Sequence, residues 1–299
     1  MPHDIIFAPK DEVLSYEEML FILRVMHKNG ISKVRITGGE PLARKDIMFF
    51  LRELSTYGFD EITLTSNGVL IGEYLEELKK LGINRINLSL DTLDKEKFHR
   101  ITMRDDFDKV MEAMHKMLDL EMTVKMNVVL MKGVNDDEIE ELAKLSLKYP
   151  IGVRFIETMP FDGKSSEQSE NFMDYKAILE KIEKALPGLK KIPDSISSTS
   201  LNYKVDGSPG TVGVIPAYSR TFCSSCNRIR LTSLGELKTC LYEGGGVSVR
   251  DFIRENPGDE EKLWKMLMTS IKGKYKDGFI AEAKSEKDGN KESMSAIGG

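Results

Sequence analysis

The three cysteines of this chain are the residues with the clearest chemistry. Cys223 and Cys226 form a C-x-x-C pair, and Cys240 follows after thirteen intervening residues, with no fourth cysteine among the 299 residues. Thiolates bind soft and borderline metals, and a C-x-x-C pair can hold one centre with little strain in its loop. Three thiolates leave one position of a four-ligand centre open. The spacing therefore predicts a metal site with a position free for substrate or water.

Two metals fit this ligand set. A structural zinc site closes four ligands, so zinc would also need a histidine, and none lies near the cysteines in sequence. A 4Fe-4S cubane accommodates three protein ligands and leaves one iron free. The ligand count favours iron and sulfur, although folding could bring a histidine to the site. The candidates are His3, His27, His99 and His115.

Two arginines stand directly beside the C-x-x-C pair. Arg228 and Arg230 are separated by one residue, so on a strand both side chains would face the same side. A guanidinium fork suits a phosphate or a purine edge. Elsewhere on a protein such a pair would be interpreted as a solvated surface feature. Its place beside a predicted metal ligand favours a role in binding.

Further cations lie within predicted strands. Arg35, Lys125 and Arg154 each stand among apolar neighbours. A buried charge there costs free energy unless it meets a partner, although a lone lysine can also extend to water from a sheet edge. The chain has neither a G-x-x-x-x-G-K-[ST] loop nor a G-x-G-x-x-G motif. We therefore expect scattered cations, and not a phosphate loop, to hold an anionic ligand.

Alternating strand and helix patterns must position these residues. β-Branched runs at 33–37, 61–65, 85–90, 123–130 and 151–157 predict five strands. Helical patterns occur at 16–30, 46–57, 73–81, 107–120 and 136–148, the first opened by a Ser15–Glu18 capping box. This alternation predicts βαβ units and a parallel sheet or barrel, whose chemistry lies at the carboxyl ends of the strands.

Unusual residues gather at those strand ends. Each Gly-Gly or Asn-Gly pair, taken alone, is explained by turn chemistry. Their shared position at one edge of the predicted sheet favours a functional site. The residues at or near these ends are Gly38-Gly39-Glu40-Pro41, Ser66-Asn67-Gly68, Ser89, Asp91 and Met159, while Lys125 lies within the fourth strand.

The alternation stops after Pro160. A polar loop is predicted at 162–170, a helix at 173–186, short strand-like pieces within 195–214 and a helix at 263–271, before a charged tail from 283. We expect two regions, a partial barrel at 1–160 and a region at 161–299 that carries the arginine pair and the metal site.

Composition limits the class of protein. Apolar residues make up 40% and charged residues 30% of the chain, and its net charge is −5. This acidic balance argues against a nucleic-acid-binding surface, and no apolar run approaches the length of a bilayer span. Three clustered cysteines predict a metal site in a reducing compartment. We therefore expect a cytoplasmic protein with no nucleic-acid or membrane partner.

Three motifs together resemble the GTP 3',8-cyclase family of radical S-adenosylmethionine enzymes. They are VRITGGEPL at 34–42, C-x-x-C-x-R-x-R at 223–230 with the third cysteine after it, and the terminal MSAIGG. The resemblance implies an α/β fold, a partial (β/α)6 barrel with a C-terminal iron-sulfur extension. It also implies a lyase that uses two 4Fe-4S clusters and S-adenosylmethionine. Its product would be (8S)-3',8-cyclo-7,8-dihydroguanosine 5'-triphosphate, the first intermediate of molybdopterin synthesis.

The resemblance also implies roles for individual residues. S-adenosylmethionine would contact Gly39, Ser89 and Met159. GTP would contact Arg35, Thr65, Lys125 and the Arg228-Ile229-Arg230 segment, with Arg154 as a catalytic residue. Cys223, Cys226 and Cys240 would ligate the second cluster, and Gly298-Gly299 would reach into the site. Implied partners are an electron donor, a downstream cyclic pyranopterin synthase and a second copy of the chain in a homodimer.

The chain departs from the family pattern at its start. The C-x-x-x-C-x-x-C motif that holds the first cluster is absent, and in relatives Met-Pro follows its last cysteine, as Met1-Pro2 opens this sequence. We expect the first barrel strand to be missing with it and this polypeptide alone to be inactive as a cyclase. A metal-bearing GTP-binding module or a pseudoenzyme is the alternative. A peptide-modifying radical enzyme would carry a longer, cysteine-richer extension.

Overall fold

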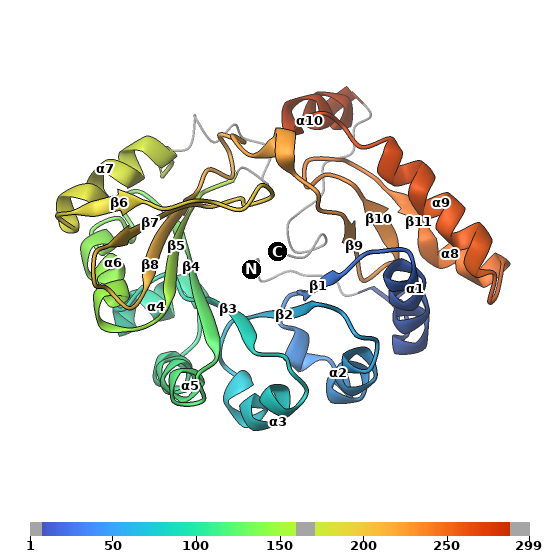
Figure 1. Ribbon diagram of the computed structural model, residues 1–299, viewed down its shortest axis with the longest axis horizontal. Coiled ribbons are helices and arrows are strands. Elements are labelled where there is room, and N and C mark those ends of the chain that lie inside the picture. Colours follow the sequence, from blue (N-terminus) through green and yellow to red (C-terminus); the bar gives the residue numbers. More distant parts are fainter. Residues whose placement is uncertain (1–7, 160–170, 288–299) are drawn as a thin grey trace. The chain divides into compact units, whose positions relative to one another are not determined.

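The computed structural model describes residues 8–159 and 171–287. The chain divides into two compact units, Met1–Ile62 with Asn227–Gly299, and Thr63–Cys226. The division predicted at residue 160 separates a barrel region from a metal-binding region, and not two compact units. It stays a prediction. Figure 1 shows the elements in sequence colours.

A mostly parallel sheet forms the centre of the unit at 63–226 (Figure 1). Its strands follow the order β2-β3-β4-β5-β8-β7-β6, with β2 to β5 and β8 parallel and the β7 and β6 pairings antiparallel. The strands are β2 Glu61–Ser66, β3 Arg85–Ser89, β4 Thr123–Leu130, β5 Gly152–Glu157, β6 Leu189–Lys191, β7 Leu201–Val205 and β8 Thr211–Ile215.

The parallel strand β8 is the main element that the alternation pattern missed. It pairs with β5 from Gly152↔Thr211 to Ile156↔Ile215. The sequence there predicts only short strand-like pieces. No helix separates β8 from the hairpin strand β7 before it, so the βα alternation gives no signal. Its TVGVI sequence is nevertheless β-branched, as a buried parallel strand should be.

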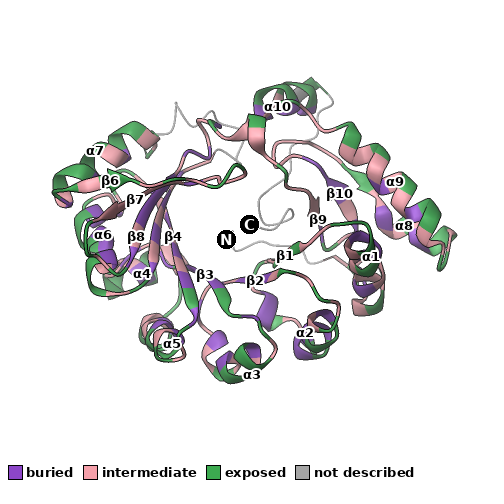
Figure 2. Cartoon of the chain, viewed as in Figure 1, coloured by how far each residue is buried: buried purple, intermediate pink, exposed green. Residues whose placement is uncertain are grey.

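Helices cover the apolar face of this sheet. Helix α5 packs on β4, and α6 packs on β5 and β8. Leu64, Leu88, Met126, Phe155 and Val214 are fully buried between these layers, and Figure 2 shows buried residues in purple along the same strands, interrupted by more exposed ones. The helices are η2 Ile71–Glu73, α3 Leu75–Lys80, α4 Lys95–Thr102, α5 Phe107–Asp119, α6 Ile139–Lys148, α7 Tyr175–Ala185 and η4 Cys223–Ser225.

The second unit joins both ends of the described chain. Its β1 lies beside the start of β2, where the Glu61 N–H donates to the Ser32 carbonyl at 3.4 Å. Strands β11-β10-β9 form a small antiparallel sheet. The elements are α1 Tyr16–Lys28, β1 Lys33–Ile36, η1 Pro41–Ala43, α2 Ile47–Ser55, β9 Arg230–Leu231, β10 Glu236–Lys238, β11 Val247–Ser248, α8 Val249–Glu255, α9 Glu260–Lys272 and α10 Gly278–Lys287.

The core of this second unit unites segments far apart in sequence. Ile22 and Val25 of α1 pack with Leu237, Leu263 and Leu267. The predicted capping box is confirmed, since the Ser15 hydroxyl accepts from the Glu18 N–H and the Glu18 carboxylate accepts from the Ser15 N–H. Helices α4, α8 and α10 were not predicted. They are short, and residues 283–287, assigned to the charged tail, belong to α10.

Phe155→Ala tests the packing of the parallel sheet. Phe155 is 0% exposed, so truncation leaves a cavity that the surrounding strands and helices fill only in part. We expect the free energy of unfolding in urea to fall by about 3–5 kcal/mol. Ile196→Ala is the control, because Ile196 is 92% exposed and its truncation should change the free energy by less than about 0.5 kcal/mol. Equal effects of the two substitutions would contradict the described packing.

Candidate functional site

A row of polar side chains crosses the face of the sheet opposite the helix-covered core. Thr65, Asn87, Lys125, Gly152 and Thr211 lie in register across the five parallel strands. In-register residues of parallel strands point to the same face. The Asn87 amide donates to the Thr65 hydroxyl at 3.3 Å, which ties two strands of the row together. Thr65 and Lys125, both predicted to contact GTP, therefore share one face.

A second polar row lies two residues further along the strands. Ser89, Asn127, Arg154, Gly213 and Asn202 are in register from β3 to β7. Because strand side chains alternate, this row faces the same side as the first. The fold thus brings together four residues singled out from sequence, which are Thr65, Ser89, Lys125 and Arg154.

The glycine in the second row leaves room for its neighbours. A Cβ at Gly213 would lie 2.3 Å from Ser200 Oγ, 2.9 Å from Asn202 Oδ1 and 3.6 Å from Arg154 Cγ. Any side chain there would displace the groups around Arg154. Gly213 could not be selected from sequence, because a single glycine in a strand indicates only a bulge or a close approach.

Two buried oxygens in this region lack a partner among the described residues. Asn127 Oδ1 and Ser200 Oγ are shielded from solvent and have no hydrogen-bond partner there. A buried polar atom without a partner costs about 1–3 kcal/mol. Asn127 lies between Ser89 and Arg154 in the second row. These oxygens would be satisfied by a ligand or a water that carries N–H or O–H groups.

Asp91 follows β3 and is held by the end of β4. Its Oδ1 accepts from the Val129 N–H at 2.8 Å, and its carbonyl accepts from the Asn135 amide at 2.7 Å. Burial raises the pKa of Asp91 from 3.8 to about 6, and the Val129 hydrogen bond only partly opposes this. The raised pKa means that the protonated carboxyl group is more favourable, relative to the carboxylate, in the folded chain than in the unfolded chain.

Asp91→Asn tests this pKa. In the parent, the native state binds more protons than the unfolded state between the two pKa values, so stability falls as the pH rises from about 4 to about 6. Asparagine retains the acceptor for Val129 and cannot ionise. We expect the variant to lose this fall and to be more stable at neutral pH by roughly 2 kcal/mol, measured by urea unfolding across the pH range. Asp108→Asn, at an exposed site, is the control, and a parent-like pH profile for Asp91→Asn would contradict the raised pKa.

The end of β5 is anchored through Glu157. This buried carboxylate accepts from the Tyr175 N–H, the Ser219 N–H and the Ser219 hydroxyl, each at 2.7 Å. Met159, predicted to contact S-adenosylmethionine, is half-buried two residues further on. The three hydrogen bonds therefore fix the strand end from which Met159 projects.

In the other unit, three arginines lie close enough to interact. The Arg35 side chain is exposed at the surface of β1. The protein around it still lowers its pKa, first by removing part of its water and then through the positive charges of Arg228 and Arg230, while Glu61 opposes them. Lys274 Nζ donates to the Arg228 carbonyl at 2.6 Å. Positive charges gathered in this way favour an anionic ligand.

The predicted arginine pair is only partly on a strand. Arg230 opens β9 and pairs with Lys238 of β10, whereas Arg228 precedes the strand. The two side chains would face the same side only if one strand contained both residues, and β9 begins at Arg230. Ile229, between them, packs against the apolar core of its unit.

The Gly-Gly-Glu-Pro segment forms a tight turn after β1. The Glu40 carboxylate accepts from the Leu42 N–H at 3.2 Å and caps the short helix η1, which Pro41 begins. Gly39 is exposed. The turn thus leaves the backbone at Gly39 open to approach by a ligand.

None of the three cysteines, all within the described part of the chain, forms a disulfide there, and all three are half-buried. Cys223 and Cys226 share the turn η4, where the Cys226 N–H donates to the Cys223 carbonyl at 3.2 Å. They belong to one unit and Cys240 to the other. Within residues 8–159 and 171–287, no three His, Cys, Asp or Glu side chains form a group that could hold a metal ion. The sulfur donors of the three cysteine side chains are of the type that holds an iron-sulfur cluster. His3 and Gly298-Gly299, also named from sequence, lie outside the described residues.

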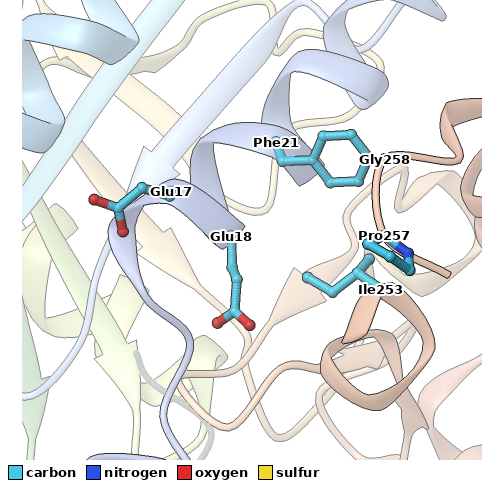
Figure 3. A pocket seen from close by; sticks show the side chains of 6 residues that line it. All are labelled: Glu17, Glu18, Phe21, Ile253, Pro257 and Gly258. Carbon is cyan, nitrogen blue, oxygen red and sulfur yellow. The ribbon is translucent and has the colours of Figure 1, made fainter. Parts of the chain in front are cut away.

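A shallow pocket of about 230 Å³ lies between α1 and α8 (Figure 3). It is lined by Glu17, Glu18, Phe21, Ile253, Pro257 and Gly258. Glu18 is already bound to the Ser15 N–H and to Arg254. None of the site residues predicted from sequence lines this pocket.

Comparisons with known proteins cover nearly the whole chain. Residues 2–146 match the model of the Radical SAM superfamily, and residues 151–280 match that of Molybdenum Cofactor Synthesis C. The GTP 3',8-cyclase of Alkaliphilus metalliredigens is 41% identical over 290 residues, which cover 96% of this chain and 88% of that protein. Mouse molybdenum cofactor biosynthesis protein 1 is 41% identical over 258 residues, which are 86% of this chain but 40% of that protein. This chain therefore spans less than half the length of its animal relatives.

Solved structures support the fold class. Streptococcus suis SuiB bound to S-adenosylmethionine aligns with a TM-score of 0.59 at 16% identity, covering 80% of this chain and 55% of that one. At this identity the likeness shows the fold alone. With the mostly parallel sheet, it confirms the predicted α/β class of a partial radical-SAM barrel. Among the described helices, none has the length and apolar character needed to cross a membrane.

Proposed function

Because this chain belongs to the GTP 3',8-cyclase family of radical S-adenosylmethionine enzymes, we propose that it serves the conversion of GTP to (8S)-3',8-cyclo-7,8-dihydroguanosine 5'-triphosphate. This reaction opens molybdopterin synthesis. The observation that carries the proposal is the gathering of Arg35, Arg228 and Arg230, since the charges of Arg228 and Arg230 add to the effect of desolvation in lowering the pKa of Arg35. A triphosphate supplies the negative charge that such a group requires.

The residues of the site have separate roles in this proposal. Arg35, Arg228 and Arg230 hold GTP through charge-assisted hydrogen bonds, and Ile229 contacts it through the backbone or side chain. Thr65 and Lys125, in the first polar row, contact the same substrate. Arg154, in the second row, is the catalytic contact. An arginine stays charged throughout, so its role would be to hold and stabilise negative charge and not to transfer protons.

S-adenosylmethionine is assigned to Gly39, Ser89 and Met159. Two observations support a ligand of this kind. Gly39 leaves its backbone open after β1, and Asn127 Oδ1, next to Ser89 in register, is a buried acceptor without a described partner. The amino and hydroxyl groups of S-adenosylmethionine are donors, as are those of GTP.

Cys223, Cys226 and Cys240 are assigned to a 4Fe-4S cluster with one open iron. When bound, the cluster would supply an iron that coordinates the purine of GTP. The family reaction also needs a cluster that cleaves S-adenosylmethionine, and the 299 residues contain no further cysteines for it. We therefore expect these residues alone to bind GTP without cyclising it. The electron donor, the cyclic pyranopterin synthase, the homodimer and the cytoplasmic location are part of the same proposal.

Calorimetric titration of the anaerobically reconstituted chain with GTP tests the function. Saturable binding at one site per chain is expected, and GMP should bind more weakly because it offers less negative charge to the arginines. No binding of GTP, or equal affinity for GTP and GMP, would contradict the proposed triphosphate contacts.

A further inference from the structure

The loop after β10, which carries Cys240, is closed by Glu243. Glu243 Oε2 accepts from the Thr239 N–H at 2.8 Å, from the Thr239 hydroxyl at 2.9 Å and from the Cys240 N–H at 3.3 Å. The Glu243 N–H donates to the Cys240 carbonyl, also at 3.3 Å. Both backbone groups of Cys240 are thus bound to one residue.

A buried lysine fixes Glu243 from the other side. Lys238 is 0% exposed, and its Nζ donates to the Glu243 carbonyl at 3.2 Å. Lys238 is itself in register with Arg230 of β9. The loop from Lys238 to Glu243 is therefore tied to the small sheet at its start and to itself at its end.

The position of Cys240 depends on these hydrogen bonds more than the positions of the other two cysteines do. Cys223 and Cys226 share one turn, so their separation is set by that turn. Cys240 stands alone in sequence and must be placed by its own loop. Metal sites require the supporting hydrogen bonds around a ligand as well as the ligand.

We infer that Glu243 is the positioning residue that holds Cys240 as a cluster ligand, an inference that rests on the proposed iron-sulfur site. Glu243 Oε2 accepts all three hydrogen bonds from Thr239 and Cys240, so in this proposal Glu243 acts through the loop and not as a ligand. Its negative charge beside a thiol is a second, electrostatic effect, which the test must separate from positioning.

Glu243→Ala and Glu243→Gln separate the two effects. Both remove the charge, but glutamine keeps an oxygen that can accept from Thr239 and Cys240. In the metal-free chain we measure alkylation of each cysteine by iodoacetamide with peptide mass spectrometry, using Cys223 and Cys226 as internal references. Glu243→Ala should speed alkylation of Cys240 about tenfold, and Glu243→Gln should stay close to the parent rate.

The reconstituted chain supplies the second readout. Glu243→Ala should retain fewer irons and give a broadened electron paramagnetic resonance spectrum after reduction, with Glu243→Gln restoring both. Glu255→Ala, which removes an exposed carboxylate on α8, should match the parent. Alkylation of Cys240 at the parent rate in Glu243→Ala, or equal acceleration in both variants, would overturn the positioning role. A parent chain that binds no iron would overturn the cluster proposal, while the alkylation rates would still decide the role of Glu243.

Discussion

Arg228→Ala is expected to weaken GTP binding to the reconstituted chain about a hundredfold, because it removes a guanidinium that can make two charge-assisted hydrogen bonds to the triphosphate. The main-chain carbonyl of residue 228 that accepts from Lys274 is retained in the variant, so the loop before β9 should stay in place. Calorimetric titration gives the dissociation constant directly.

Two control variants make this result specific. Arg24→Ala removes an arginine from the same unit, one that is half-exposed and paired with Glu260, and should leave GTP affinity unchanged. Arg228→Lys keeps the charge but loses the planar fork, and should fall between the parent and Arg228→Ala. Parent-like affinity in Arg228→Ala, or the same loss in Arg24→Ala, would show that Arg228 does not contact the nucleotide.

Cys226→Ser is expected to reduce the iron content of the reconstituted chain from about four atoms to near zero. A serine hydroxyl does not ionise at neutral pH and is a poor ligand for iron. Loss of the Cys226 thiol therefore leaves Cys223 as the one thiol at the turn η4. Iron, sulfide and zinc are measured together on the same sample.

The metal found in the parent decides between the two sites that the ligand count allows. About four irons and four sulfides per chain support the cubane, whereas about one zinc supports a structural site with a histidine as fourth ligand. Cys226→Ser is compared with Ser224→Ala, which alters the same turn without touching a thiol. Full iron in Cys226→Ser would remove this residue from the ligand set.

The parallel sheet was predictable because its signal is local. The five β-branched runs from 33–37 to 151–157 correspond to β1 to β5, with no end shifted by more than one residue. The capping box at Ser15 was also predicted, since it depends on two residues of adjacent sequence. Strand β8 was missed because its place beside β5 depends on a long-range pairing.

The sequence predicts which residue types form the site, but not which residues hold them in place. Lys125 and Arg154 attracted notice because charges are rare in buried strands, and the register then placed them in neighbouring polar rows. Gly213, Asn127 and Glu243 carry no such signal. The roles of this glycine, amide and carboxylate can be inferred only from the residues that surround them in the fold.

The central claim is that this chain binds GTP at an iron-sulfur cluster held by Cys223, Cys226 and Cys240. Electron paramagnetic resonance of the reduced, reconstituted 299-residue chain, recorded with and without GTP, tests it most directly. We expect a 4Fe-4S signal whose line shape changes when GTP is added. In Arg228→Ala the line shape should not change at the same nucleotide concentration. A chain without such a signal, or a spectrum that GTP leaves unaltered at saturation, would contradict it.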